Sequence, residues 1–166
     1  IIFTDGNADS ATSYTPYSRD DSPYPEDLWH WLEETSAATG DHFVSIPHNS
    51  NISKGFMFPL ETLRGERFTP EYLQLRRKWE PVVEATQTKG DSETYPTLSP
   101  QDAFADFERY TFYIQASPAP YQPGAGDFVR SALNRGLRLG QEYGINPYQF
   151  GLIGSTDSHT GLSSPQ

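Results

Sequence analysis

The sequence predicts an α/β protein in which short strands alternate with helices. Strand-like runs at residues 43–46, 81–87 and 150–154 are short and rich in apolar residues, and the segments between them include amphipathic runs with helical spacing. The expected order is β, α, β, α, β, α, α, β. This order favours parallel strands in a sheet or barrel within a single domain of 166 residues. The 13 glycines and 14 prolines predict long irregular loops.

The first part of the chain should contain a strand, a long loop, a helix and a second strand. Residues 1–3 form the first expected strand, and the polar residues 4–23 form the loop. A helix should begin near Pro25, because proline fits the first helical turn and two acidic residues follow it there. Gly40 is the expected end of this helix. The second strand follows at residues 43–46.

The remaining elements are predicted from capping residues and apolar spacing. A proline follows a capping residue at both Thr69 and Ser99, which is typical of helix starts. The last helix has the clearest spacing, and we expect Phe128, Leu133 and Leu137 on its buried face. The expected elements are helices at 69–79, 99–107 and 127–143, strands at 81–87 and 150–154, and a loop at 110–126.

Composition excludes several classes of function. A formal net charge of -10 argues against a general surface for nucleic acid or anionic membranes, because both need basic patches. The negative charge does not exclude a phosphate substrate, because bound metal ions can make the local electrostatic potential positive. The absence of cysteine excludes disulfides and thiolate metal sites but leaves the compartment, bacterial cytoplasm or periplasm, undecided. No run is long and apolar enough for a membrane span.

Two expected strands end in residues that commonly bind metals. The strand at 150–154 is followed by Asp157 and His159, and the strand at 43–46 runs into His48. A carboxylate together with imidazoles suits zinc, manganese or iron. Because these folds place their chemistry beyond the carboxyl ends of the strands, we expect these three side chains to share one site.

Each of these residues also has a purely structural interpretation. Asp157 could stabilise a turn, and a single histidine such as His48 is more often structural than a ligand. Two histidines at equivalent strand ends favour a shared site more than either one does alone. The other two histidines, His30 within an expected helix and His42 at the start of a strand, are expected to be structural or solvent-facing.

Four further residues are candidates for the same site. Glu84 lies inside the strand at 81–87, where a carboxylate is costly unless it is solvated, paired or bound to metal. Glu84 could therefore lie on a solvated edge of the sheet or belong to a metal site. Lys89 could contact an oxyanion or phosphate. Asn49 and Asn51 could contact substrate or support the ligands, although ordinary turn-rich loops are the alternative at all three positions.

Four segments together resemble one bacterial family. They are Ile-Pro-His-Asn-Ser-Asn at 46–51, the stretch at 79–93, Phe-Ala-Asp-Phe-Glu at 104–108, and Gly-Ser-Thr-Asp-Ser-His-Thr-Gly at 154–161. The family is domain-of-unknown-function family 3604, related to the polymerase-and-histidinol-phosphatase (PHP) superfamily of metal-dependent hydrolases. The resemblance implies a distorted parallel β/α barrel, with two or three divalent metals held by His, Asp and Glu at the carboxyl ends of its strands.

The resemblance also implies ligand roles. His48 matches the ligand of the family's Pro-His motif, and Asp157 with His159 matches its closing Asp-x-His pair, which would also be catalytic. Glu84 matches a strand position that is acidic in many relatives. Asn49, Asn51 and Lys89 would contact substrate.

The chain also departs from the family's pattern. The opening His-x-His strand, the Asp/His segment and the Glu-containing strand are not present, and four histidines cannot form the usual ring. The chain begins at Ile1 without an initiator Met or a basic signal region. We therefore expect residues 1–166 to be a single partial domain, the C-terminal portion of a PHP-like catalytic domain.

The predicted function is a metal-dependent hydrolase, specifically a phosphoesterase that attacks a small-molecule ester with a metal-activated water. Two or more zinc, manganese or iron ions are implied in the intact protein, and the isolated chain is expected to be inactive. Sulfate and amide hydrolysis use similar centres and remain open. The alternative is a non-catalytic fragment or acidic binding module. That chain would assemble with the missing N-terminal part, with another chain or with another copy of itself.

Overall fold

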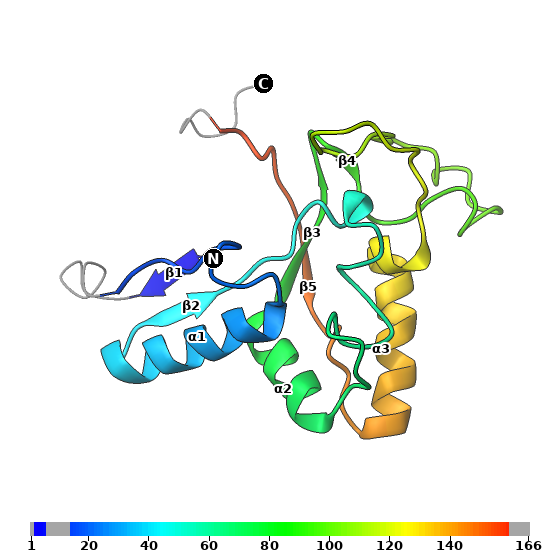
Figure 1. Cartoon of the computed structure of the whole chain (residues 1–166). Helices are drawn as coiled ribbons and strands as arrows, with labels where there is room; N and C mark the ends of the chain where they lie inside the picture. The colour runs from blue at the N-terminus through cyan, green and yellow to red at the C-terminus, as the bar shows by residue number, and fades with distance from the viewer. Residues whose placement is uncertain (1, 6–13, 160–166) are drawn as a thin grey trace.

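The computed structural model describes residues 2–5 and 14–159 (Figure 1). It confirms a mixed α/β fold. The helices and strands are β1 (Ile2–Asp5), α1 (Pro25–Thr39), β2 (His42–Val44), α2 (Pro70–Trp79), β3 (Val82–Gln87), β4 (Gly90–Asp91), α3 (Val129–Tyr143) and β5 (Gly151–Gly154), with short 3-10 turns η2 (Ser50–Ile52) and η3 (Ala125–Asp127). Among the described helices, none has the length and apolar character needed to cross a membrane.

The strands form two small sheets. The central sheet has the order β4-β3-β5, in which β3 and β5 are parallel, as predicted, and pair Val82 with Gly151 and Thr86 with Gly154. The short β4 returns antiparallel to β3. The second sheet joins β1 and β2 in antiparallel fashion. The pairing is therefore mixed rather than uniformly parallel.

Residues 45–49 continue from β2 alongside β3 and in the same direction. The Ser45 N–H donates to the Trp79 carbonyl at 3.0 Å, and further along the Glu84 N–H donates to the Pro47 carbonyl at 3.0 Å. The carboxyl ends of this segment, of β3 and of β5 therefore lie at one end of the central sheet.

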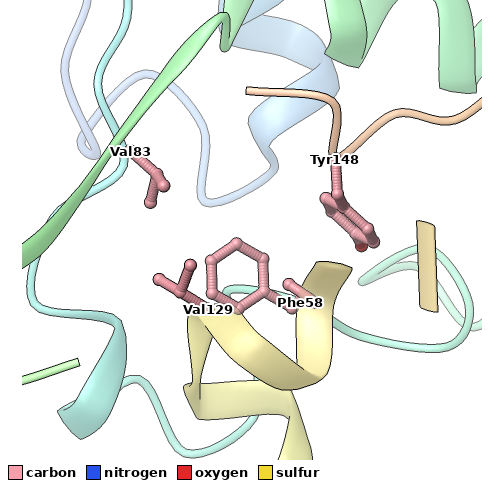
Figure 2. Close-up of a cluster of buried hydrophobic side chains, with 5 residues drawn as sticks. Phe58, Val83, Val129 and Tyr148 are labelled. Atoms are coloured by element: carbon pink, nitrogen blue, oxygen red, sulfur yellow. The ribbon is translucent and has the colours of Figure 1, made fainter. Parts of the chain in front are cut away.

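Two hydrophobic clusters hold these elements together. One lies between β3 and α3 and contains Phe58, Val83, Val129, Ala132 and Tyr148, and Figure 2 shows the labelled members of this cluster around one interior space. The other lies among α1, β2 and α2 and contains Trp29, Leu32, Phe43 and Trp79. Figure 1 accordingly shows α3 on one side of β3 and β5, with α1 and α2 on the other.

A buried ion pair lies between the two clusters. Arg76 Nε of α2 is 2.9 Å from Glu80 Oε2 just beyond the helix, and both residues are buried. The Trp29 indole N–H donates to Glu80 Oε1 at 3.2 Å, and the guanidinium of Arg76 lies 4.8 Å from the Tyr148 ring. Burial raises the pKa of Glu80, and the charge of Arg76 opposes that rise. The pair thus links the two clusters.

The predicted helix at 99–107 is wrong. This segment forms consecutive turns, in which the Phe104 N–H donates to the Asp102 carboxylate at 2.9 Å. Phe104 and Phe107 are both exposed. A short helix gains most of its stability by burying an apolar face against the rest of the protein, and this segment has only Ala105 buried.

The predicted buried face of α3 is wrong at Leu133 and Leu137, although Phe128 is buried and the helix forms and ends before Gly144, as predicted. Leu133 and Leu137 are exposed, and the buried residues of the helix are Val129, Ala132 and Gly136. Small residues allow closer packing: a side chain at Gly136 would lie 2.1 Å from the Asn146 amide oxygen. The small residues of this face let the side chains of Asn146 and Tyr148 pack directly against the helix backbone.

Candidate functional site

Polar side chains gather where the segment at 45–49, β3 and β5 end. The Gln87 amide donates to the Asn49 side-chain oxygen, which joins the first segment to β3. The Thr88 hydroxyl donates to the Thr156 carbonyl at 3.0 Å, which joins β3 to the residues after β5. We define the polar rim as Asn49, Gln87, Thr88, Lys89, Ser155, Thr156 and Asp157.

Asp157 combines an uncommon backbone conformation with two basic neighbours. Its φ of 50° lies in the left-handed region, which is uncommon outside glycine, asparagine and aspartate. Its carboxylate forms an ion pair with Lys89 Nζ through Oδ2. Its other oxygen is 3.9 Å from Nε2 of His159, whose side chain is 78% exposed. The structure therefore brings together three of the predicted site residues, with the imidazole open to solvent.

Glu84 lies on β3, directly beside the start of the polar rim. It is 5% exposed, and one carboxylate oxygen accepts a hydrogen bond from the Ser155 hydroxyl. The other oxygen, Oε2, is buried and has no hydrogen-bond partner among the described residues. An unpaired carboxylate oxygen inside a protein is costly, so it marks a place where a cation or a donor would stabilise the fold.

His48 is not joined to the other predicted ligands. It is exposed, and its Nδ1 lies 3.3 Å from the Ile46 carbonyl oxygen. Within residues 14–159, no group of three or more His, Asp or Glu side chains is close enough to hold a metal ion. The described geometry therefore provides a pair, Asp157 with His159, and a separate buried carboxylate. His30 and His42 are solvent-exposed, as predicted.

The two predicted asparagines occupy different environments. Asn49 is half-buried, has a left-handed φ of 55° and accepts the bond from Gln87. Asn51 is fully buried, and its amide donates to the Lys89 carbonyl at 2.8 Å while its oxygen accepts from the Ser92 hydroxyl at 3.0 Å. Asn51 thus fixes the backbone that carries Lys89.

A buried aspartate holds the loop that carries these asparagines. Asp127, in η3 just before α3, accepts hydrogen bonds from the Gly55 N–H at 2.5 Å, the Ser53 hydroxyl at 2.9 Å and the Gly124 N–H at 2.8 Å. Burial raises the pKa of Asp127, and these three donors oppose that rise. The loop after His48 is therefore tied to the start of α3.

Several residues at this end were not predicted from the sequence. Gln87 and Thr88 could have been found, because they are the first polar residues at and after the end of β3. Arg109 and Tyr110 line a cavity beside the polar rim but carry no local signal. They belong to the turns and loop after β4, and only the tertiary fold brings them here.

The whole chain, residues 1–166, matches the family model described as a protein of unknown function (DUF3604). The chain therefore belongs to this family, as the resemblance of its segments suggested. A search of curated proteins and a search of solved structures each gave no match.

Proposed function

We propose that this chain contributes to a metal-dependent phosphoesterase whose site is at the polar rim. The observation that carries the proposal is a carboxylate within one of two parallel strands and a second carboxylate just beyond the other. Asp157 follows β5 and extends towards Lys89, while Glu84 of β3 has a buried oxygen with no partner among the described residues. Functional residues of α/β proteins concentrate at the carboxyl ends of such strands.

The types of donor fit zinc, manganese or iron, and the set is partial. Catalytic zinc sites use three protein ligands and leave one position for water. The described residues provide Asp157 with His159 as a pair, and Glu84 and His48 separately. We therefore propose that donors outside these 166 residues complete the centre, and that the chain forms the C-terminal portion of a PHP-like β/α barrel.

The roles of the chain's own residues follow from their positions. A bound divalent cation would activate water and polarise a phosphoryl oxygen. Asp157 and His159 would hold that cation. Lys89, whose ammonium already faces the Asp157 carboxylate, would neutralise charge that develops on the phosphoryl oxygens. Asn49 would contact substrate, and Asn51 would keep Lys89 in position through its backbone carbonyl.

Hydrolysis of 4-nitrophenyl phosphate with added Mn²⁺ tests the proposal in the full-length natural protein. We expect Asp157→Ala to lower kcat by at least about 100-fold without loss of folding, since it removes a ligand and the partner of Lys89. Asp20→Ala, at an exposed position, is the matched control. Retained turnover in Asp157→Ala would exclude this site, and turnover only on a sulfate ester or amide analogue would exclude the phosphoesterase assignment.

A second candidate is a non-catalytic chain that assembles with a strand of another polypeptide. One observation favours it: within the described residues β5 pairs only with β3, and its Leu152 and Ile153 are 54% and 38% exposed. Neighbouring residues of a strand face opposite sides of a sheet, so both faces are open here. Sedimentation of the isolated chain tests this candidate, and a compact monomer at high concentration would count against it.

A further inference from the structure

A cavity of about 520 Å³ lies beside the polar rim, within the size range of small-molecule sites. Three segments of the chain line it: the end of β3 with the turn into β4, the turn at 108–110, and the two residues after β5. Its lining residues are Thr86, Gln87, Thr88, Gly90, Glu108, Arg109, Tyr110, Ser155 and Thr156. We define this cavity as the Arg109 pocket.

The outer wall of the Arg109 pocket is held firmly against the sheet. The Asp91 N–H donates to the Glu108 carbonyl at 2.9 Å. Gly90, with a φ of +94°, lies so close that an added Cβ would be 2.6 Å from the Tyr110 Cβ and backbone nitrogen. Glu108 itself has a left-handed φ of 43°. This wall is therefore positioned by backbone contacts and is not a loosely attached loop.

Arg109 is oriented by its neighbours within this wall. Its Nη1 donates to the Tyr95 hydroxyl at 3.2 Å, and its guanidinium carbon lies 5.4 Å from the centre of the Tyr95 ring. The Tyr95 ring in turn lies 5.7 Å from that of buried Phe128. Arg109 also pairs with Asp106, whose side chain is 65% exposed. Tyr95 and Asp106 are not among the lining residues, but the exposed pair with Asp106 is weak, so we expect the Arg109 guanidinium, whose side chain is 35% exposed, to turn from it to an anionic ligand in the pocket.

The rest of the pocket is rich in hydroxyl groups. The lining residues Thr86, Thr88, Ser155 and Thr156 each carry a hydroxyl, and those of Thr88 and Ser155 donate to protein acceptors, which leaves their lone pairs able to accept from a ligand. Glu108 adds a carboxylate that can accept from ligand hydroxyls. Two of the lining residues directly precede proposed catalytic residues in the sequence, Thr88 before Lys89 and Thr156 before Asp157, so the pocket adjoins the segments that carry them.

We propose that the Arg109 pocket binds the non-reacting part of the substrate, a hydroxylated, sugar-like group that carries an oxyanion. Arg109 would bind the oxyanion through its planar fork of N–H donors, and the hydroxyl side chains and Glu108 would bind the hydroxylated carbon skeleton. Phosphate, sulfate and carboxylate share this oxyanion chemistry. The proposal names the substrate class of the proposed hydrolase, and only its place in the reaction depends on that function.

Isothermal titration calorimetry of the chain with glucose 6-phosphate tests this assignment directly. The buffer contains a chelator, so that binding is measured without metal. Arg109→Met is compared with Arg130→Met, which removes an arginine of similar exposure, 41% against 35%, that pairs with Glu93 and Asp102 outside the pocket. We expect Arg109→Met to weaken binding by about tenfold or more and Arg130→Met to leave it unchanged.

Further ligands and one more variant sharpen the result. Glucose and inorganic phosphate, each alone, should bind more weakly than glucose 6-phosphate. The affinities of glucose 6-sulfate and glucuronate then show whether the pocket prefers phosphate, sulfate or carboxylate. Arg109→Lys should bind with intermediate strength, because it keeps the charge and loses the fork. Circular dichroism must show an unchanged fold in all variants. If Arg109→Met unfolds, the binding affinity of Arg109→Lys is compared with that of wild type instead.

Three outcomes overturn the proposal: no saturable binding of glucose 6-phosphate, equal binding by wild type and Arg109→Met, or phosphate binding as tightly as glucose 6-phosphate. A separate Mn²⁺ titration of the full-length natural protein keeps the two proposals distinguishable. Absence of Mn²⁺ binding alone contradicts the hydrolase, whereas absence of glucose 6-phosphate binding alone contradicts the Arg109 pocket as a subsite.

Discussion

Two buried carboxylates, one at the amino end of β3 and one further along it, differ in how completely their oxygens are paired. At the amino end, Glu80 is buried and has a partner for each oxygen, Arg76 for one and the Trp29 indole for the other. Further along, within β3, Glu84 is also buried, but one of its oxygens has no partner among the described residues. Beyond β5, the residue Asp157 has a left-handed backbone conformation.

Under the proposed function, this difference distinguishes a carboxylate that stabilises the fold from one that is available to a ligand. A fully paired carboxylate such as Glu80 contributes to the fold and has no remaining capacity to bind a ligand. An incompletely paired one such as Glu84 costs free energy unless something else binds there. Conformational strain and unpaired polar groups at one location are typical of functional sites. The carboxyl end of β3 is therefore where we place the chemistry.

The largest expected effect is at the amino end. Arg76→Met should lower the free energy of unfolding by about 3–5 kcal/mol, because it leaves Glu80 buried without its ionic partner. Lys78→Met, on the same helix, removes a charge that pairs with Glu33 at the surface and should cost less than about 1 kcal/mol. Urea unfolding of both variants gives the comparison.

The double variant Arg76→Met, Glu80→Leu sharpens this result. It removes both charges, so most of the lost stability should return. If the double variant is as unstable as Arg76→Met alone, packing by the arginine side chain, rather than the unpaired charge, is the cause.

The second effect concerns the wall of the Arg109 pocket. Gly90→Ala should cost about 1–2 kcal/mol for the left-handed backbone and about 1–3 kcal/mol more for the overlap with Tyr110. Gly65→Ala is the matched control: its φ is +80°, but no atom lies within 4 Å of the added Cβ. It should show the backbone cost alone. Equal losses in thermal or urea unfolding would mean that the wall is not packed against β4.

A smaller effect is expected at Glu84, within β3. Glu84→Gln should change the free energy of unfolding by less than about 1 kcal/mol, or raise it, because it removes a buried charge whose second oxygen has no partner. The same change at Glu80 should be clearly destabilising, since it breaks the pair with Arg76. A loss of more than about 2 kcal/mol in Glu84→Gln would show that this carboxylate is structural.

Local signals in the sequence predicted the helices well. The Thr69 hydroxyl accepts from the Tyr72 N–H at 3.2 Å at the start of α2, and Gly40 and Gly144 end α1 and α3 in left-handed conformations. These caps act within one turn of the chain, so they can be read without the fold. The helix predicted at 99–107 had a capping signal but no partner surface for its apolar face.

Residues of the candidate site could be predicted from the sequence only where they directly follow a strand. Asp157 and Lys89 follow β5 and β3, and parallel pairing brings them together. Arg109 could not be predicted, because its position depends on the close approach of Tyr110 to Gly90 in the folded chain. Residues 160–161 of the family-like segment at 154–161 lie outside the described residues.

The most direct test is the zinc and manganese content of the full-length natural protein by plasma mass spectrometry after equilibrium dialysis. Wild type, Asp157→Asn, His48→Ala and the control Asp20→Asn are compared. The account predicts saturable metal in wild type and Asp20→Asn, loss of metal in Asp157→Asn, and a reduced content in His48→Ala. Metal retained by Asp157→Asn, or no metal in wild type, would contradict a cation site at the carboxyl end of β3.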